Sequence, residues 1–106
     1  MDKNTVLKII ERFKTLIENR CFKIEKIILF GSYARGDNNK TSDIDIILIS
    51  QDFVKLDYWK RIDLISEIIY EIFQPLDVFL YTPAEWEKND SFIIDYANDG
   101  EIIYAA

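Results

Sequence analysis

The chain has 106 residues, a length that fits one domain with one modest core, so we expect a single domain spanning residues 1–106. Its net charge is −6, which disfavours direct binding to a nucleic-acid backbone of the same sign. Histidine, the commonest general base and a usual zinc ligand, is absent. Any metal chemistry must therefore use oxygen ligands, which favours Mg²⁺ or Mn²⁺. No apolar run reaches the ~20 residues that a membrane span needs.

Cys21 is the single cysteine, so an internal disulfide is impossible. This fits a reducing compartment, and we expect a cytoplasmic protein. We expect Cys21 to fill a small buried apolar space, with a reactive thiol as the alternative.

Hydrophobic periodicity and turn residues divide the chain into helices and strands. A helix is predicted over residues 5–18, a strand over 24–30, a short helical turn over 32–35 and a strand over 43–49. A second long helix over 58–73 and a strand over 76–81 follow. Short helices over 83–87 and 92–98, the latter capped by Asp90 or Ser91, precede a last strand or extended tail at 102–104. This order predicts an α+β fold with a small mixed sheet and helices packed mainly on one face.

Both long helices are amphipathic, and core packing is the default interpretation of their apolar faces. The first helix has a partner-binding surface as its alternative. In the second helix, a core stripe is expected at spacings of three and four residues, formed by Trp59, Ile62, Ile65, Ile69 and Ile72.

Asp43 and Asp45 stand at the head of the second predicted strand. Because side chains alternate along a strand, both carboxylates share one face, with Cα atoms about 6.6 Å apart at a rise of ~3.3 Å per residue. Two carboxylates so close can bind one or two hard cations, although two solvated aspartates at a strand end are the alternative. Asp45 directly precedes an apolar run, where an unpaired charge is costly.

Gly31 and Ser32 follow the first predicted strand. Glycine lets the backbone approach a ligand closely, and Ser32 lies at a helix start, where free N–H groups favour an anion. The pair predicts a phosphate-binding turn, although a tight turn alone would also use these residues. Arg35 is expected either to bind a phosphate or to pair with a nearby carboxylate such as Asp37.

Asp77 is the second residue of the third predicted strand. If that strand neighbours the Asp43–Asp45 strand, Asp77 reaches the same metal ions. Three carboxylates beside a phosphate-binding turn are typical of two-metal phosphoryl or nucleotidyl transfer. Asp77 is also placed to accept the proton of an attacking hydroxyl.

These motifs carry a specific resemblance. Residues 31–36 read GSYARG and residues 42–45 read SDID, separated by five residues. This pattern resembles the signature of the DNA polymerase β-like nucleotidyltransferase superfamily, and most of all its minimal nucleotidyltransferase (MNT) branch. The segment Leu76-Asp77-Val78 corresponds to the family's strand with the third carboxylate.

The resemblance implies a role for each matching residue. Gly31 and Ser32 would bind the β and γ phosphates of ATP, Asp43 and Asp45 would hold two Mg²⁺ ions, and Asp77 would complete one metal site. It implies transfer of AMP to a tyrosine hydroxyl of a HEPN-domain toxin, an RNase that the MNT protein neutralises as an antitoxin. Two alternatives stay open: an antitoxin that neutralises its partner by contact alone, and a small-molecule nucleotidyltransferase.

Overall fold

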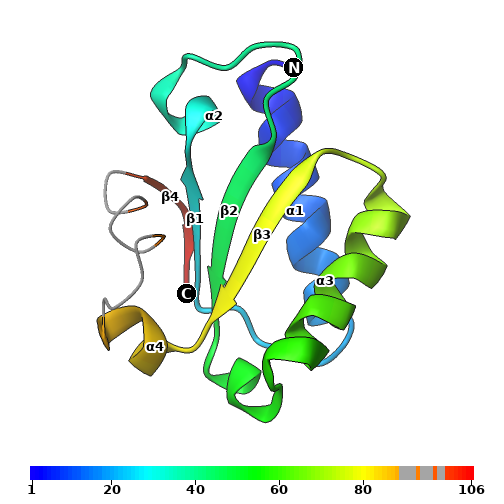
Figure 1. Ribbon diagram of the computed structural model, residues 1–106, viewed down its shortest axis with the longest axis vertical. Helices are drawn as coiled ribbons and strands as arrows, with labels where there is room; N and C mark the ends of the chain where they lie inside the picture. The colour runs from blue at the N-terminus through cyan, green and yellow to red at the C-terminus, as the bar shows by residue number, and fades with distance from the viewer. Residues whose placement is uncertain (89–92, 94–96, 98–99) are drawn as a thin grey trace.

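The structure is a computed structural model that describes residues 1–88, 93, 97 and 100–106. Within these residues, one mixed sheet contains β1 (Lys26–Phe30), β2 (Ile44–Ile49), β3 (Leu76–Tyr81) and β4 (Glu101–Ala105), in the order β3-β2-β1-β4 (Figure 1). Strand β1 is antiparallel to both β2 and β4, whereas β2 and β3 are parallel. The predicted α+β fold with a mixed sheet is confirmed.

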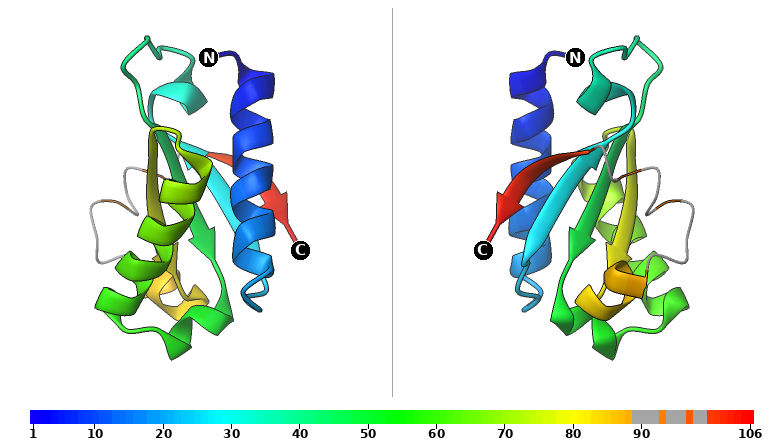
Figure 2. Two further views of the ribbon diagram at one scale, coloured as in Figure 1. Left: turned by 90° about the vertical axis from the view of Figure 1, so that its right-hand side faces the viewer. Right: turned by 90° about the vertical axis from the view of Figure 1, so that its left-hand side faces the viewer.

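Two long helices, α1 (Lys3–Glu18) and α3 (Tyr58–Ile72), pack beside each other against one face of the sheet (Figure 2). Each begins at an aspartate whose carboxylate accepts a hydrogen bond from the first turn: Asp2 from the amide of Thr5, and Asp57 from the amide of Lys60. Such caps satisfy amide groups that the helix itself leaves unpaired. The shorter helices are α2 (Ser32–Arg35), the 3₁₀ helix η1 (Gln51–Lys55) and α4 (Pro83–Lys88).

Helix α3 connects the two parallel strands β2 and β3. Parallel neighbours need such a crossover, and α3 supplies it while covering the sheet. The sequence-based expectation that the third strand lies beside the Asp43–Asp45 strand is therefore confirmed.

Alternation along the strands produces two apolar clusters, one on each face of the sheet. Ile44, Ile46 and Leu48 pack in the larger cluster with α1 and α3, while Ile47 and Ile49 pack in the smaller cluster on the opposite face. Trp86 of α4 contacts the smaller cluster, so α4 covers that second face. Asp45 falls in the same alternation as Ile47 and Ile49, which places it on the face opposite α1 and α3.

The predicted boundaries agree closely with the structure over the described chain. Helix α4 begins with a reciprocal cap, in which Thr82 Oγ1 accepts from the amide of Glu85 and Glu85 Oε1 accepts from the amide of Thr82. The alternative left open for residues 102–104 resolves as a strand, β4. The helix predicted over 92–98, with its cap at Asp90 or Ser91, lies outside the described residues.

Two expectations about burial are wrong. Cys21 is exposed, because it lies in the turn after α1 with a left-handed φ of 67° and is not a core position. Trp59 and Ile62 are also exposed, because the buried stripe of α3 is formed by Leu64, Ile68 and Ile72. At roughly 100° per residue, Trp59 points about 180° away from Ile68.

None of the helices in the described residues combines the length and the apolar character that crossing a membrane requires.

Candidate active site

Asp45 and Asp77 lie directly opposite each other on the neighbouring strands β2 and β3. The strands are parallel, so paired side chains project from the same face of the sheet. Strand β1 ends beside them, with Phe30 paired to Asp45 in the antiparallel register. Both carboxylates therefore stand at the end of the sheet where β1 terminates and where β2 and β3 begin (Figure 1).

Gly31 brings the backbone against the Asp45 carboxylate. Its φ of 74° and ψ of −154° fall in a region that is essentially restricted to glycine. A Cβ atom added to Gly31 would lie 2.1 Å from Asp45 Oδ2, far inside van der Waals contact. Glycine is thus required here twice, once for the backbone conformation and once for the room that the carboxylate occupies.

The electrostatic field of the site is dominated by negative charge. Burial, followed by the charges of Asp77 and Asp43, raises the pKa of Asp45 to about 6, against a smaller opposing effect of Arg35. Burial also raises the pKa of Asp77, with Asp43 as an additional cause. Repulsion between neighbouring carboxylates is relieved by a proton or by a bound cation.

Asp43 immediately precedes β2 and is exposed. Within the described residues, no three acidic, histidine or cysteine side chains stand in an arrangement ready to hold a metal ion. The donor set nevertheless fits a hard divalent cation, since it consists of carboxylate oxygens at one end of the sheet and a bound cation would offset their repulsion. The carboxylate of Asp45 occupies the space that a side chain at position 31 would fill.

Ser32 opens α2 directly after Gly31 and is partly buried. The first amide groups of a helix have no partner within the helix, so they are available to an anion. Helix α2 is a single turn, because Gly36 adopts a left-handed φ of 85° and ends it. The Gly31–Ser32 turn therefore lies at the same end of the sheet as the carboxylates.

Arg35 forms an ion pair with Asp37, with 3.1 Å between Arg35 Nε and Asp37 Oδ2. This is one of the two outcomes expected from the sequence, and its charge also acts on Asp45. An exposed ion pair contributes at most ~1 kcal/mol, so the guanidinium can exchange Asp37 for a phosphate at little cost.

The structure thus pairs Asp45 with Asp77 and sets Asp45 against Gly31, while Asp43 immediately precedes β2. Sequence reasoning missed the contact between Gly31 and the Asp45 carboxylate. The signal was present, since a glycine directly after a strand that pairs in antiparallel register with the Asp45 strand must lie near the head of that strand.

Comparison with known proteins identifies the family to which the chain belongs. Residues 6–100 match the family model described as the nucleotidyltransferase domain, and the chain belongs to this family. A predicted protein adenylyltransferase of Methanocaldococcus jannaschii is 36% identical over 84 residues, covering 77% of this chain and 80% of the relative. A second predicted protein adenylyltransferase of the same organism is 33% identical over 104 residues, covering 90% of this chain and 95% of the relative.

Solved structures share the fold at lower identity. A nucleotidyltransferase-like protein of Sulfolobus solfataricus aligns with a TM-score of 0.64 at 22% identity, over 96% of this chain and 85% of its own. A toxin–antitoxin structure with AMP-PNP aligns with a TM-score of 0.65 at 22% identity, over 91% and 73%. A complex of a tri-AMPylated Shewanella oneidensis HEPN toxin with an MNT antitoxin aligns with a TM-score of 0.59 at 22% identity, over 100% and 74%. These likenesses confirm the fold.

Proposed function

We propose that this protein transfers AMP from ATP to the hydroxyl group of a tyrosine in a HEPN-type RNase toxin. It thereby acts as the antitoxin of a toxin–antitoxin pair. The observation that carries the proposal is the pairing of Asp45 with Asp77 beside Gly31, with Asp43 two residues before Asp45. Membership of the nucleotidyltransferase family supports the reaction type. The relatives named as protein adenylyltransferases support a protein acceptor, and the toxin–antitoxin neighbours support the class of partner.

In this proposal Asp43 and Asp45 hold two Mg²⁺ ions, or Mn²⁺ in their place, and Asp77 completes one of the two metal sites. The bound cations supply electrostatic stabilisation of the charge that develops on the transferred phosphate. Gly31 and Ser32 bind the β and γ phosphates through the backbone and the serine hydroxyl, and Arg35 adds a positive charge to the same nucleotide.

The reaction is an in-line displacement at the α-phosphorus of ATP. The acceptor oxygen forms a bond to this phosphorus, the bond from it to the oxygen that bridges to the β-phosphate breaks, and pyrophosphate leaves. In this proposal the hydroxyl proton passes to the carboxylate of Asp77, which is exposed at the head of the edge strand β3. No histidine is available for this role. Because ATP is the substrate, we place the protein in the cytoplasm.

The test is the mass of the toxin after incubation of the purified complex with Mg-ATP. The wild-type protein should raise the mass of the HEPN-domain partner by one or more AMP units, whereas Asp45→Asn should give no increase. Glu11→Gln, which neutralises an exposed carboxylate on α1, is the matched control and should transfer AMP normally. If Asp45→Asn neutralises the toxin as well as the wild type does, and the toxin gains no mass with either protein, the antitoxin neutralises the toxin by contact alone.

A further inference from the structure

Helix α3 carries a second apolar face that the fold does not use. Four large side chains on it are exposed: Trp59 (72%), Ile62 (39%), Tyr70 (83%) and Phe73 (83%), the last at the C-cap. Because the helix turns once every ~3.6 residues, these positions lie within about 80° of one another on the side away from Ile68. We call these four side chains the α3 stripe. An exposed apolar patch of several aromatic side chains on a small protein is typical of an interaction surface.

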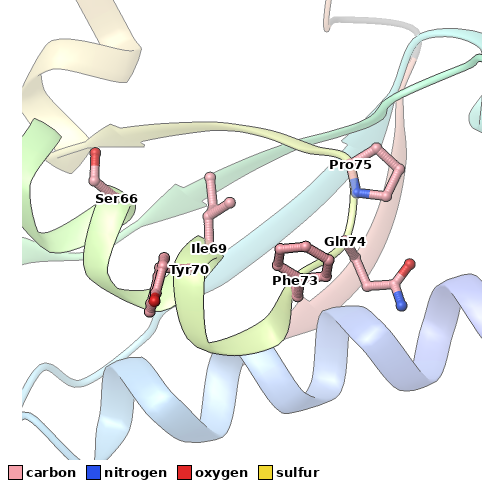
Figure 3. Close-up of a pocket in the computed structure, with 6 residues that line it drawn as sticks. All are labelled: Ser66, Ile69, Tyr70, Phe73, Gln74 and Pro75. Atoms are coloured by element: carbon pink, nitrogen blue, oxygen red, sulfur yellow. The ribbon is translucent and has the colours of Figure 1, made fainter.

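The end of the stripe borders a cavity of about 590 Å³. Its lining comes from the last turns of α3 and from the start of β3, as Figure 3 shows: Ser66, Ile69, Tyr70, Phe73, Gln74 and Pro75. The surface is therefore hollowed beside two exposed aromatic rings, a shape that accepts a protruding apolar side chain of a partner.

Phe73 is held in a conformation that opposes its residue type. Its φ of 57° and ψ of 50° are left-handed, which is the usual place for glycine at a helix end. Its ring is also exposed, so folding gains little from burying it. A phenylalanine that is strained and exposed at once is better explained by binding than by stability.

The charge around the stripe defines the partner. Asp63, Glu67 and Glu71 follow one another at intervals of four residues along an adjacent side of α3, and all three are exposed. Arg20 offsets part of this row through an ion pair with Glu67 at 3.6 Å. With a net charge of −6, two copies of the chain repel each other, as does a nucleic acid. The complementary occupant is a protein segment that is apolar on one side and basic on the other.

The C-terminal end of the α3 stripe lies at the end of the sheet that holds the candidate active site. Pro75 lines the cavity, and its carbonyl oxygen accepts a hydrogen bond of 2.8 Å from the amide of Ile44, the residue between Asp43 and Asp45. Asp77 follows two residues later on the edge strand β3, where the sheet is open to a partner. A protein docked on the stripe therefore lies at the same end of the sheet as the carboxylates but on the opposite face, so its acceptor segment must pass around the edge strand β3 to reach them.

We propose that the α3 stripe, with the adjacent cavity, is the docking surface for a basic amphipathic helix of the protein that carries the acceptor hydroxyl. The identity of that protein rests on the proposed function, whereas its apolar and basic character is inferred from the structure of the α3 stripe. The stripe sets the affinity for the acceptor, and the carboxylates carry out the transfer.

The first test uses two labelled synthetic peptides of about 15 residues, the length of α3, one of leucine and lysine and one of leucine and glutamate. The basic peptide should bind and the acidic peptide should not, as measured by fluorescence anisotropy. Tyr70→Ser, a change at an exposed position, should weaken binding by about 10-fold or more. The matched control is Ile102→Ser, since Ile102 is 57% exposed on β4, the opposite edge strand. Equal binding of both peptides, or equal loss in both variants, overturns the inference.

Two further measurements separate the remaining outcomes. If sedimentation shows that the wild type is a dimer and that Tyr70→Ser is a monomer, the stripe binds a second copy of the chain and a basic partner is refuted. In transfer assays with the HEPN-domain protein, Tyr70→Ser should raise the KM for that acceptor about tenfold and leave kcat unchanged. If Asp45→Asn abolishes transfer but Tyr70→Ser leaves KM unaltered, docking elsewhere is indicated and the proposed function stands. If the basic peptide binds but no AMP is transferred, the proposed function fails and the docking surface stands.

Discussion

Replacing Asp45 with asparagine should make the metal-free protein more stable at neutral and alkaline pH. The carboxylate of Asp45 has a pKa of about 6 in the folded chain against an ordinary value of 3.8, because of burial and the neighbouring Asp77 and Asp43. The folded state therefore binds the proton more tightly than the unfolded state does. The contribution of Asp45 to wild-type stability should fall as pH rises from about 4 to 6 and level off above that.

The magnitude follows from the same two pKa values. A difference from 3.8 to about 6 corresponds to about 3 kcal/mol for a fully desolvated group. Asp45 is partly accessible to solvent, which screens its charge, so the expected gain from Asp45→Asn is roughly 1–2 kcal/mol at pH 8. At pH 3.5 the wild-type carboxyl is protonated in both states, and the gain should vanish.

The assay is urea unfolding in EDTA at pH 8 and at pH 3.5, with the transition midpoints of the two proteins compared at each pH. Glu11→Gln on the exposed surface of α1 serves as the control for the loss of one negative charge. A gain for Asp45→Asn that is the same at both pH values, or a loss at pH 8, would refute the electrostatic reasoning.

Four further predictions come from single contacts. Gly31→Ala should lower the free energy of unfolding by about 2–4 kcal/mol, because it adds backbone strain and a clash with Asp45 Oδ2. The control is Gly36→Ala, which has the same sign of φ but open space around its Cβ, and it should lose only about 1 kcal/mol when both are compared by thermal unfolding. Phe73→Gly should raise the free energy of unfolding by about 1 kcal/mol because it relieves a left-handed conformation under an exposed ring, and a clear loss would show that the ring supports the fold. Arg61 donates hydrogen bonds to three backbone carbonyl groups, two at η1 and its C-cap and one on β3. Arg61→Met should therefore lower the free energy of unfolding in urea by about 2–3 kcal/mol. A loss near zero would mean that water replaces the guanidinium group. Millimolar Mg²⁺ should raise the melting temperature of the wild type and leave that of Asp45→Asn nearly unchanged, and equal shifts would place the cation elsewhere.

Much of the fold follows from local signals in the sequence. The apolar run at residues 46–49 matches β2, because a strand inside a sheet is covered on both faces. Strand β3 lies at the edge of the sheet and is buried only at alternate residues, and its apolar and aromatic residues over 76–81 are typical of a strand. The helix between them is long enough to reverse the chain, and this connection predicts parallel pairing of the two strands. The meeting of Asp45 and Asp77 was therefore predictable from topology as well as from the family motif.

The errors concern burial, which depends on what lies beyond each element. Ile62 and Trp59 fit a helical apolar stripe as well as Leu64 and Ile68 do, and the sequence does not show which of the two faces meets the sheet. Cys21 has a residue type that is usually buried, but the turn after α1 decides its exposure. The close contact of Gly31 with Asp45 likewise depends on strand register, which the motif alone does not specify.

The position of the label in ATP shows whether Asp43, Asp45 and Asp77 catalyse transfer of AMP. The HEPN-domain partner is incubated with Mg²⁺ and with ATP labelled at either the α or the γ phosphate. The account predicts that the partner gains label from the α position only, with one pyrophosphate released per AMP, and that Asp45→Asn transfers none. Label from the γ position, or undiminished α label with Asp45→Asn, would contradict it.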